Sequence, residues 1–289
     1  MNQKRLIQQN SIPRFFKVMV VFSIVLIMSG CSSLSAFLFY PSKHYYQSPE
    51  QLGLNAERVN ITTEDGEILA NWFVKSSIES KGVILFLHGN GENISTHINS
   101  VAWLPQHGYD VFLLDYRGYG QSTGVSTLPS ALSDVEDAHR WLSSRQDKRP
   151  LFVFGQSLGG GLAVTYTANY NHELEKIEAL ITESAPASWP QIAREAMSKS
   201  WITWLLQIPV LLMPGQYDAE DHIVEISSVP ILLMHSKQDP VVGYHHGQQL
   251  FEKTQGHAQW LETQGGHIAG LNDPAIQTAF LKFLELSSN

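Results

Sequence analysis

Cysteine is almost absent from this chain of 289 residues. Cys31 is the only one, so no disulfide can form within the molecule. Long apolar runs are lacking as well: the run from Val18 to Met28 has eleven residues, whereas a membrane-spanning helix needs about 20. Internal repeats and low-complexity segments are also absent. The length fits one large domain with a sizeable core and a short N-terminal appendage.

Positive charge is scarce. Lys and Arg number 19 against 27 Asp and Glu, which gives a formal net charge of −8. Four of these cations lie near the N-terminus, and no basic patch interleaved with aromatic residues occurs. Nucleic acid and anionic membrane surfaces repel such a domain. We therefore expect no nucleic-acid partner and no membrane binding through surface charge.

Motifs for a dinucleotide or a metal are incomplete. Gly89-Asn90-Gly91 begins like a dinucleotide-binding loop, but Ile94 stands where the third glycine belongs. Asp115 lies too far along the chain to be the ribose-binding acid. No HExxH sequence occurs, and the adjacent His245 and His246 would point about 100° apart in a helix. The sequence predicts neither a cofactor nor a metal site.

The first 30 residues have the pattern of an export signal. Four cations, with no acidic residue among them, precede or flank an apolar run of signal-peptide length. The run ends in Met28-Ser29-Gly30-Cys31, which resembles the lipobox of bacterial lipoproteins, with Met28 in place of the usual Leu. We expect residues 1–30 to be cleaved and a lipid to be attached to Cys31. An uncleaved signal anchor is the alternative.

Both alternatives place the following domain outside the cytoplasm, because the positive residues stay inside. The resemblance to lipoproteins also implies sorting to the outer membrane, facing the periplasm, because Ser32 rather than Asp follows the cysteine. The expected membrane contact is thus the N-terminal lipid. Residues 31–57 contain several aromatic residues and two prolines. They are expected to form a tether whose aromatic side chains pack against the domain.

The domain proper, residues 58–289, alternates apolar strands with helical segments. The expected strands are Arg58–Thr63, Ile68–Val74, Val83–Leu87, Val111–Leu114, Leu151–Phe154, Ala179–Thr182, Ile231–Met234 and Ala258–Glu262. The first two form a hairpin through Glu64-Asp65-Gly66-Glu67. The expected helices include Ser130–Arg145, Gly243–Lys253 and Ala275–Leu286. This order predicts an α/β fold with a mostly parallel central sheet and helices on both faces.

Residues 187–223 interrupt this alternation between the predicted strands Ala179–Thr182 and Ile231–Met234. They are rich in tryptophan and leucine, including Trp189, Trp201 and Trp204. We expect a short cap inserted at this point. Either the cap is an ordinary cover packed on the core, or its apolar side chains form the wall of a site for an acyl chain.

Gly155-Gln156-Ser157-Leu158-Gly159 directly follows an apolar strand and opens a helix-like segment. G-x-S-x-G between a strand and a helix forms the nucleophile elbow, a sharp turn that exposes the serine hydroxyl. Glycines two residues before and after the serine allow a close backbone approach that a Cβ would block. Ser157 is therefore the predicted nucleophile. An inert serine in a glycine-rich turn is the alternative.

A serine nucleophile requires a base and an acid that orients the base. Asp239 and His267 each follow one of the last two predicted strands, so both lie at the carboxyl edge of the sheet, as the elbow does. We predict His267 as the base and Asp239 as the acid. Glu183, which also ends a strand, is the rival acid.

Eleven other histidines compete with His267 for the role of base. His257 precedes the last strand and belongs to the opposite edge of the sheet. His235 is expected to be buried and hydrogen-bonded. His245 and His246, at the start of a helix near Asp239, are expected to be exposed; the alternative is that one of them lines the site.

Two backbone amides are predicted to form an oxyanion hole. One is the N–H of Leu158, which follows the nucleophile at the start of a helix. The other is the N–H of Asn90, in a glycine-flanked turn after the strand Val83–Leu87. A plain strand-to-helix turn is the alternative for this second segment. His88 is expected to hold the turn rather than to take part in chemistry.

Together these segments resemble the serine aminopeptidase-like branch of the α/β-hydrolase superfamily, which includes BEM-like and depalmitoylase-like proteins. The resemblance covers roughly Arg58 to Leu286. The residues that carry it are His88-Gly89-Asn90-Gly91, Asp115-Tyr116-Arg117-Gly118-Tyr119-Gly120, Gly155-Gln156-Ser157-Leu158-Gly159-Gly160, Asp239 and Gly266-His267. It implies the α/β-hydrolase fold and a Ser-Asp-His triad, and it is compatible with esterases, thioesterases, lipases and peptidases.

The expected function is hydrolysis of a small-molecule carboxylic ester or thioester through an acyl-enzyme, without a cofactor. An apolar cap favours acyl groups over peptides. A serine peptidase or aminopeptidase of the same fold is one alternative, and acyl transfer to an acceptor other than water is another. A third is a non-catalytic binding module of the cell envelope that retains the fold.

Overall fold

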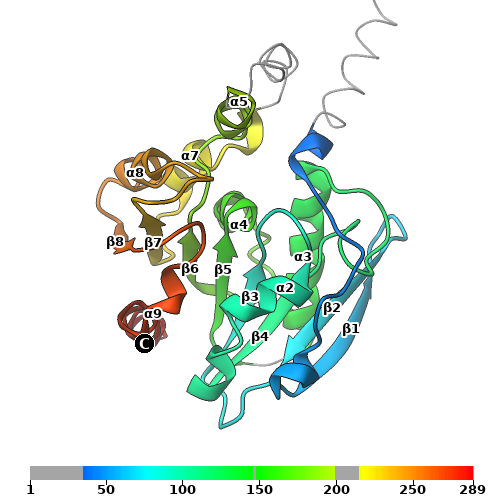
Figure 1. Cartoon of the computed structure of the whole chain (residues 1–289). Coiled ribbons are helices and arrows are strands. Elements are labelled where there is room, and N and C mark those ends of the chain that lie inside the picture. Colours follow the sequence, from blue (N-terminus) through cyan, green and yellow to red (C-terminus); the bar gives the residue numbers. More distant parts are fainter. Residues whose placement is uncertain (1–34, 146–147, 199–214, 289) are drawn as a thin grey trace, which may run out of the picture.

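One eight-stranded sheet forms the centre of the structure (Figure 1), a computed structural model that describes residues 35–145, 148–198 and 215–288. The strands are β1 (Ala56–Thr62), β2 (Ile68–Val74), β3 (Gly82–Leu87), β4 (Tyr109–Leu114), β5 (Leu151–Gln156), β6 (Ile177–Glu183), β7 (Ile231–Ser236) and β8 (Ala258–Thr263). Their order is β1-β2-β4-β3-β5-β6-β7-β8. The pairs β1–β2 and β2–β4 are antiparallel, and the other neighbouring pairs are parallel. The mostly parallel sheet and the N-terminal hairpin are as predicted.

Helices cover both faces of this sheet (Figure 1). The longer ones are α3 (Leu128–Ser144), α4 (Leu158–Asn169), α5 (Trp189–Ser198), α8 (Tyr244–Lys253) and α9 (Pro274–Ser287); the short ones are α2 (Ile94–His97) and α7 (Ala219–His222). The 3-10 turns are η1 (Ser35–Leu38), η2 (Pro49–Leu52), η3 (Ile98–Ser100), η4 (Leu104–His107), η6 (Gly215–Tyr217), η7 (Ile223–Glu225) and η8 (Gly270–Asn272). Residues of α3, α4 and α8 belong to one hydrophobic core, and residues of α2 and α9 belong to the other. The α/β-hydrolase fold class predicted from the sequence is therefore confirmed.

The two cores explain the unbroken apolar runs of the central strands. In β3, Val83 and Leu85 lie in the first core, whereas Ile84 and Phe86 lie in the second. Successive side chains of a strand point to opposite faces, and both faces are covered. All residues of β3 are consequently buried.

Several strands continue past their apolar runs. In β5, Gly155 pairs with Leu87 of β3, and Gln156 pairs with Glu183 of β6. Backbone pairing does not depend on an apolar side chain, so the apolar pattern underestimated the length of β5. The longer strand places Ser157 directly at the carboxyl edge of the sheet.

The N-terminal segment, residues 35–55, runs along the outside of the domain past α2 to β1 (Figure 1). Phe39 lies in the first core, and the ring of Tyr45 packs edge-on against Trp72. Tyr40 and Tyr46 are 69% and 53% exposed, so the prediction that their side chains pack against the domain is wrong. β1 begins at Ala56, two residues before the predicted start of the domain.

Several predicted features lie outside the described residues. These include the signal peptide, Cys31 and the middle of the cap with Trp201 and Trp204. The segment predicted to form the cap is described on both sides of this gap, as α5 before it and η6, α7 and η7 after it. None of the helices in the described ranges combines the length and apolar character that a membrane crossing requires.

Candidate active site

Ser157 occupies a strained turn between β5 and α4. Its backbone has φ 53° and ψ −120°, and a positive φ is uncommon for a residue other than glycine. Such outliers persist where the surroundings hold them, often at functional sites. The N–H of Ser157 donates to the carbonyl of Glu183 at 2.8 Å, which fixes the turn on the neighbouring strand.

The glycines around Ser157 are required by close backbone contacts. A Cβ on Gly155 would lie 2.2 Å from the carbonyl oxygen of Gly159. A Cβ on Gly159 would lie 2.1 Å from the carbonyl oxygen of Leu87 in β3. The start of α4 therefore sits directly on the sheet, in the geometry expected of a nucleophile elbow.

His267 and Asp239 meet at the same edge of the sheet. His267 lies on the loop after β8, and its Nδ1 is 2.8 Å from Oδ2 of Asp239, on the loop after β7. The other carboxylate oxygen, Oδ1, accepts the N–H groups of Val241 and Val242 at 2.8 and 3.0 Å. Asp239 is therefore held in the position from which it orients the imidazole of His267.

The environment of Asp239 keeps it ionised. Burial alone would raise the pKa of its carboxyl group, but the hydrogen bond and charge of His267, with hydrogen bonds from Ser184 and Val241, outweigh burial and lower this pKa to about 2. The side chain of Asp239 is fully buried, whereas that of His267 is 18% exposed. The carboxylate is thus anionic at neutral pH, and the imidazole is open to a reactant.

Glu183, the rival acid, has other partners. Its Oε1 accepts the N–H of Gly270 at 2.7 Å, and its Oε2 accepts Nε2–H of Gln156 at 2.6 Å. Burial raises the pKa of this carboxyl group, against the lowering effect of the two hydrogen bonds. Glu183 therefore links the segment after His267 to the strand that carries Ser157, and Asp239 rather than Glu183 contacts the imidazole.

The predicted oxyanion segment adjoins Ser157. A Cβ added to Gly89 would lie 3.3 Å from the Cβ of Ser157, so the turn that contains Asn90 passes close to the serine. Leu158 is the first residue of α4, and its N–H consequently has no acceptor within the helix. These positions suit the two amides for an oxyanion. His88 is buried, and its Nδ1 lies 2.7 Å from the carbonyl oxygen of Gly89, within the same turn.

His97 is a site neighbour that the sequence did not indicate. Its ring stacks on that of His88, with centroids 5.2 Å apart, and a Cβ on Gly89 would lie 3.2 Å from its Cε1. Burial, with a contribution from His88, lowers the pKa of His97 to about 3. His97 thus adds a neutral ring beside the turn. A lone histidine in a short helix carries no sequence signal of this role.

Two of the other histidine predictions have clear outcomes. His235 is buried, and its Nε2 lies 3.0 Å from the carbonyl oxygen of Val242, as predicted. His246 was expected to be exposed, and this is wrong, because α5 covers it. His245 next to it is exposed, with 48% of its side chain accessible.

A carboxylate and two imidazoles meet between α5 and α8. Glu195 lies 2.9 Å from Nε2 of His245 and 3.2 Å from Nε2 of His246, an arrangement of donor atoms that could surround an ion. However, the N–H of Ala187 donates to Nδ1 of His246 at 3.1 Å. The proton of the neutral ring is then on Nε2, which leaves no lone pair there for a metal. The cluster fits a hydrogen-bonded link between the two helices better than a metal site.

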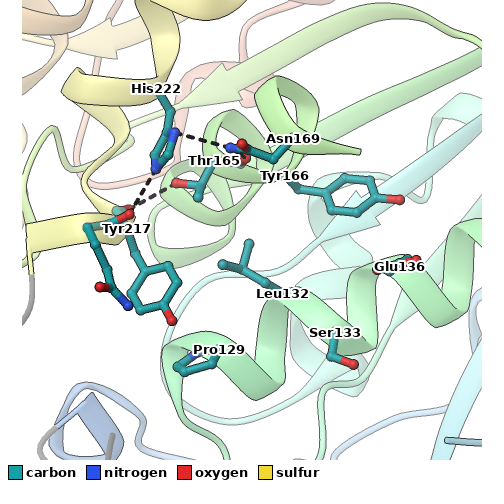
Figure 2. A pocket seen from close by; sticks show the side chains of 10 residues that line it. Pro129, Leu132, Ser133, Glu136, Thr165, Tyr166, Asn169, Tyr217 and His222 are labelled. Carbon is teal, nitrogen blue, oxygen red and sulfur yellow. Dashed lines mark hydrogen bonds between the residues drawn. The ribbon is translucent and has the colours of Figure 1, made fainter. Parts of the chain in front are cut away.

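A cavity of about 460 Å³ lies away from these residues, between α3, the second half of α4 and the segment from η6 to α7 (Figure 2). The residues that line it are Pro129, Leu132, Ser133, Glu136, Thr165, Tyr166, Asn169, Gln216, Tyr217 and His222. Thr165 donates to the carbonyl of Tyr217, and Asn169 lies 3.1 Å from Nδ1 of His222. Some polar groups of the wall thus form hydrogen bonds with one another. None of the predicted catalytic side chains is among the residues that line the cavity.

Buried neutral histidines should make the fold sensitive to acid. His139 is buried between the hydroxyl of Tyr166 and the carbonyl of Glu175, each 2.8 Å from a ring nitrogen. Burial lowers its pKa to about 4, and burial also lowers the pKa values of His235 and His246. The unfolded chain binds protons near pH 6.5 while native His139 stays neutral until about pH 4. We therefore expect His139 alone to reduce the free energy of unfolding by about 2 kcal/mol between pH 7.5 and 5.

Urea unfolding of wild type and His139→Gln at both pH values measures this contribution. The variant is expected to be less stable than wild type at pH 7.5. Between pH 7.5 and 5, however, its free energy of unfolding should fall by about 2 kcal/mol less than that of wild type. His257→Gln, at an exposed position, is the matched control. Its free energy of unfolding should fall between pH 7.5 and 5 by as much as that of wild type. Equal losses in all three proteins would contradict the prediction.

Comparison with known proteins places the chain among hydrolases. It matches the family model described as serine aminopeptidase S33 over residues 78–221. It is 32% identical over 244 residues to the uncharacterized protein YfhR of Escherichia coli strain K12, which covers 82% of this chain and 81% of that protein. It is 29% identical over 191 residues to the lysophosphatidylserine lipase ABHD12 of Mus musculus, which covers 62% of this chain and 47% of that protein.

Solved structures show the same architecture. The esterase Pf2001 of Pyrococcus furiosus superposes with a TM-score of 0.70 at 20% identity, over 87% of this chain and 98% of that one. An α/β hydrolase from Vibrio vulnificus gives a TM-score of 0.65 at 18% identity, over 80% of this chain and 81% of that one. At these identities the likeness is one of fold.

Proposed function

This chain belongs to the α/β-hydrolase superfamily, and from that premise we propose that it is a serine hydrolase of carboxylic esters or thioesters. The single observation that carries the proposal is the placement of three groups at one edge of the sheet. Ser157 stands on its strained turn, and the His267–Asp239 pair with its 2.8 Å contact lies on the adjacent loops. The similarity to a lysophosphatidylserine lipase favours an acyl substrate.

The proposed reaction begins with attack of Ser157 Oγ on the acyl carbonyl, while Nε2 of His267 takes the hydroxyl proton. Asp239, anionic at neutral pH, holds Nδ1–H and stabilises the imidazolium that forms. The N–H groups of Asn90 and Leu158 donate to the oxyanion. His267 then protonates the leaving alcohol or thiol. Water, activated by the same ring, hydrolyses the acyl-enzyme and regenerates the serine.

A fluorophosphonate probe tests the chemistry directly. We expect one equivalent of probe to label the native protein, and peptide mapping to locate it on Ser157. Heat-denatured protein is the control, because its labelling would be unspecific. A folded protein that does not label would contradict the proposal and favour a non-catalytic binding module.

Substrate class is tested with two matched series of chromogenic substrates. We expect turnover of p-nitrophenyl esters, with an optimum in acyl-chain length, and little turnover of aminoacyl p-nitroanilides. The anilides are included because the matched family model is that of a serine aminopeptidase, and they test the alternative of peptidase activity. Preference for the anilides would replace the esterase proposal with a peptidase.

Attachment to the cell envelope belongs to the proposal and is supported by the sequence around Cys31 alone. The N-terminal lipid would keep the enzyme at the outer membrane, facing the periplasm. The intact mass of the protein isolated from membranes tests the lipid anchor: a lipid-modified N-terminal Cys31 supports it, and a chain that keeps an unmodified Met1 contradicts it and favours the uncleaved signal anchor.

A further inference from the structure

The side chain of Asn90 is held by the N-terminal segment. Its Oδ1 accepts three hydrogen bonds: from the N–H of Tyr40 at 2.8 Å, from the hydroxyl of Tyr119 at 3.0 Å and from the N–H of Gly91 at 2.8 Å. Its Nδ2 donates to the carbonyl of Leu38. All these partners surround the carboxamide of Asn90, the residue whose backbone N–H is proposed to donate to the oxyanion.

The residues that follow Asn90 are held by the same segment. The N–H of Ser42 donates to the carbonyl of Glu92 at 3.0 Å, in a parallel bridge between Pro41 and Glu92. Nδ2 of Asn93, which is buried, donates to the carbonyl of Ser42 at 2.9 Å. A segment about fifty residues upstream thus borders the whole turn.

The turn needs such support because its backbone is unusual. Gly91 has φ 81° and Glu92 has φ 56°, and a non-glycine residue in this region is strained. Glu92 is exposed, so no packing of its own side chain holds it. The hydrogen bond from Ser42 to its carbonyl is a restraint from outside the turn.

The second restraint comes from the core. Phe39 is 7% exposed, and its ring lies edge-on to that of Tyr119, with centroids 6.4 Å apart. Burial of Phe39 therefore fixes the position of its neighbours Leu38 and Tyr40, whose backbone groups bond the carboxamide of Asn90. We name Leu38–Ser42 together with Tyr119 the clamp.

We infer that the clamp is a positioning element of the oxyanion hole and that the Asn90 carboxamide connects the two. This rests on the proposed function and adds to it a role for residues that precede the catalytic domain predicted from the sequence. The clamp touches no reacting atom. It sets the direction of the Asn90 N–H, and a misplacement of about 1 Å in a catalytic group costs on the order of 10²-fold in rate.

Two substitutions break the clamp from opposite sides. Asn90→Leu removes every side-chain hydrogen bond at similar volume and keeps the backbone N–H. Tyr40→Pro removes the N–H that donates to Oδ1 of Asn90, together with the exposed tyrosine ring. Its matched control is Tyr40→Ala, which keeps that N–H and removes an exposed ring. A second control, Ser35→Ala, removes the hydroxyl that accepts the N–H of Leu128, a contact of the N-terminal segment made away from the turn.

The expected result is a selective loss of transition-state stabilisation, measured on p-nitrophenyl butyrate. Asn90→Leu should lower kcat about 100-fold with KM within about threefold of wild type, because an oxyanion donor is worth about 10² to 10³. Tyr40→Pro should lower kcat at least tenfold more than Tyr40→Ala. The double variant Asn90→Leu/Tyr40→Pro should be no slower than Asn90→Leu alone, because both changes act on one connection. The two controls should retain wild-type kcat.

A trifluoromethyl ketone separates positioning from loss of structure. Its adduct with Ser157 places an oxyanion in the hole, so its Ki should rise in proportion to the fall in kcat/KM. Complete labelling by the fluorophosphonate probe establishes that each variant is folded. Wild-type kcat in labelled Asn90→Leu, or equal rates for Tyr40→Pro and Tyr40→Ala, would overturn the clamp and leave the hydrolase in place. Wild-type protein that neither labels nor turns over ester would overturn both.

Discussion

Replacing His267 by Ala is expected to lower kcat on esters by about 10⁴ to 10⁶, with KM almost unchanged. The imidazole removes the proton from Ser157 during attack and returns it to the leaving group, so its loss disables both steps. Ser157→Ala should have an effect of the same size. The double variant should be no slower than either single one, because members of a triad act as a unit.

Two carboxylate-to-amide substitutions test which acid supports the histidine. Asp239→Asn removes the charge that holds Nδ1–H of His267, and we expect kcat to fall by about 10³ to 10⁴. Glu183→Gln should cost less than about tenfold. Its new amide faces Gln156, whose Oε1 has no hydrogen-bond partner in the described structure and becomes the acceptor after a flip of that amide. Comparable losses in the two variants would contradict the assignment of Asp239.

Much of the fold follows from the sequence because the sheet is buried on both faces. Strands such as β3 must be apolar throughout to fill two cores at once, and this makes them visible as runs. The elbow and the edge positions of Asp239 and His267 then follow from the order of strands. The rival Glu183 was harder to separate, because it too ends a strand and only its bonds to Gly270 and Gln156 show its role.

What the sequence did not reveal depends on contacts between distant segments. The burial of His246 results from the position of α5, which brings Glu195 over the ring. The clamp on Asn90 uses backbone groups of Leu38 and Tyr40, and backbone groups are the same for every sequence. Neither contact leaves a periodic pattern, so the sequence predicted a tether over residues 31–57 but not a support for the site.

Gly159→Ala is expected to destabilise the protein by more than about 4 kcal/mol, a loss that only a few mechanisms produce. The added Cβ would lie 2.1 Å from the carbonyl oxygen and 2.5 Å from the carbonyl carbon of Leu87, and 2.6 Å from the carbonyl oxygen of His88. All three are backbone atoms of β3 and the turn that follows, so no side chain can move aside. Either α4 lifts from the sheet or the turn that carries Asn90 is displaced.

The direction of this effect distinguishes packing from helix propensity. Gly159 is the second residue of α4, and alanine favours a helix over glycine by about 0.5 to 1 kcal/mol in its interior. Propensity alone would therefore predict a more stable variant. Gly53→Ala is the matched control, because a Cβ there meets nothing within 4 Å and only its φ of 72° opposes alanine, at about 1 to 2 kcal/mol.

Urea unfolding of wild type, Gly159→Ala and Gly53→Ala at pH 7.5 shows whether packing or helix propensity determines stability at position 159. We expect Gly53→Ala to unfold at a slightly lower urea concentration than wild type. Gly159→Ala should unfold at a far lower urea concentration or be unfolded without urea. A Gly159→Ala variant as stable as Gly53→Ala would show that β3 and α4 can separate at little cost. The close contact between Gly159 and the backbone of Leu87 and His88 would then not be needed to hold the serine turn beside the oxyanion segment. The presence of glycine at position 159 would need another explanation.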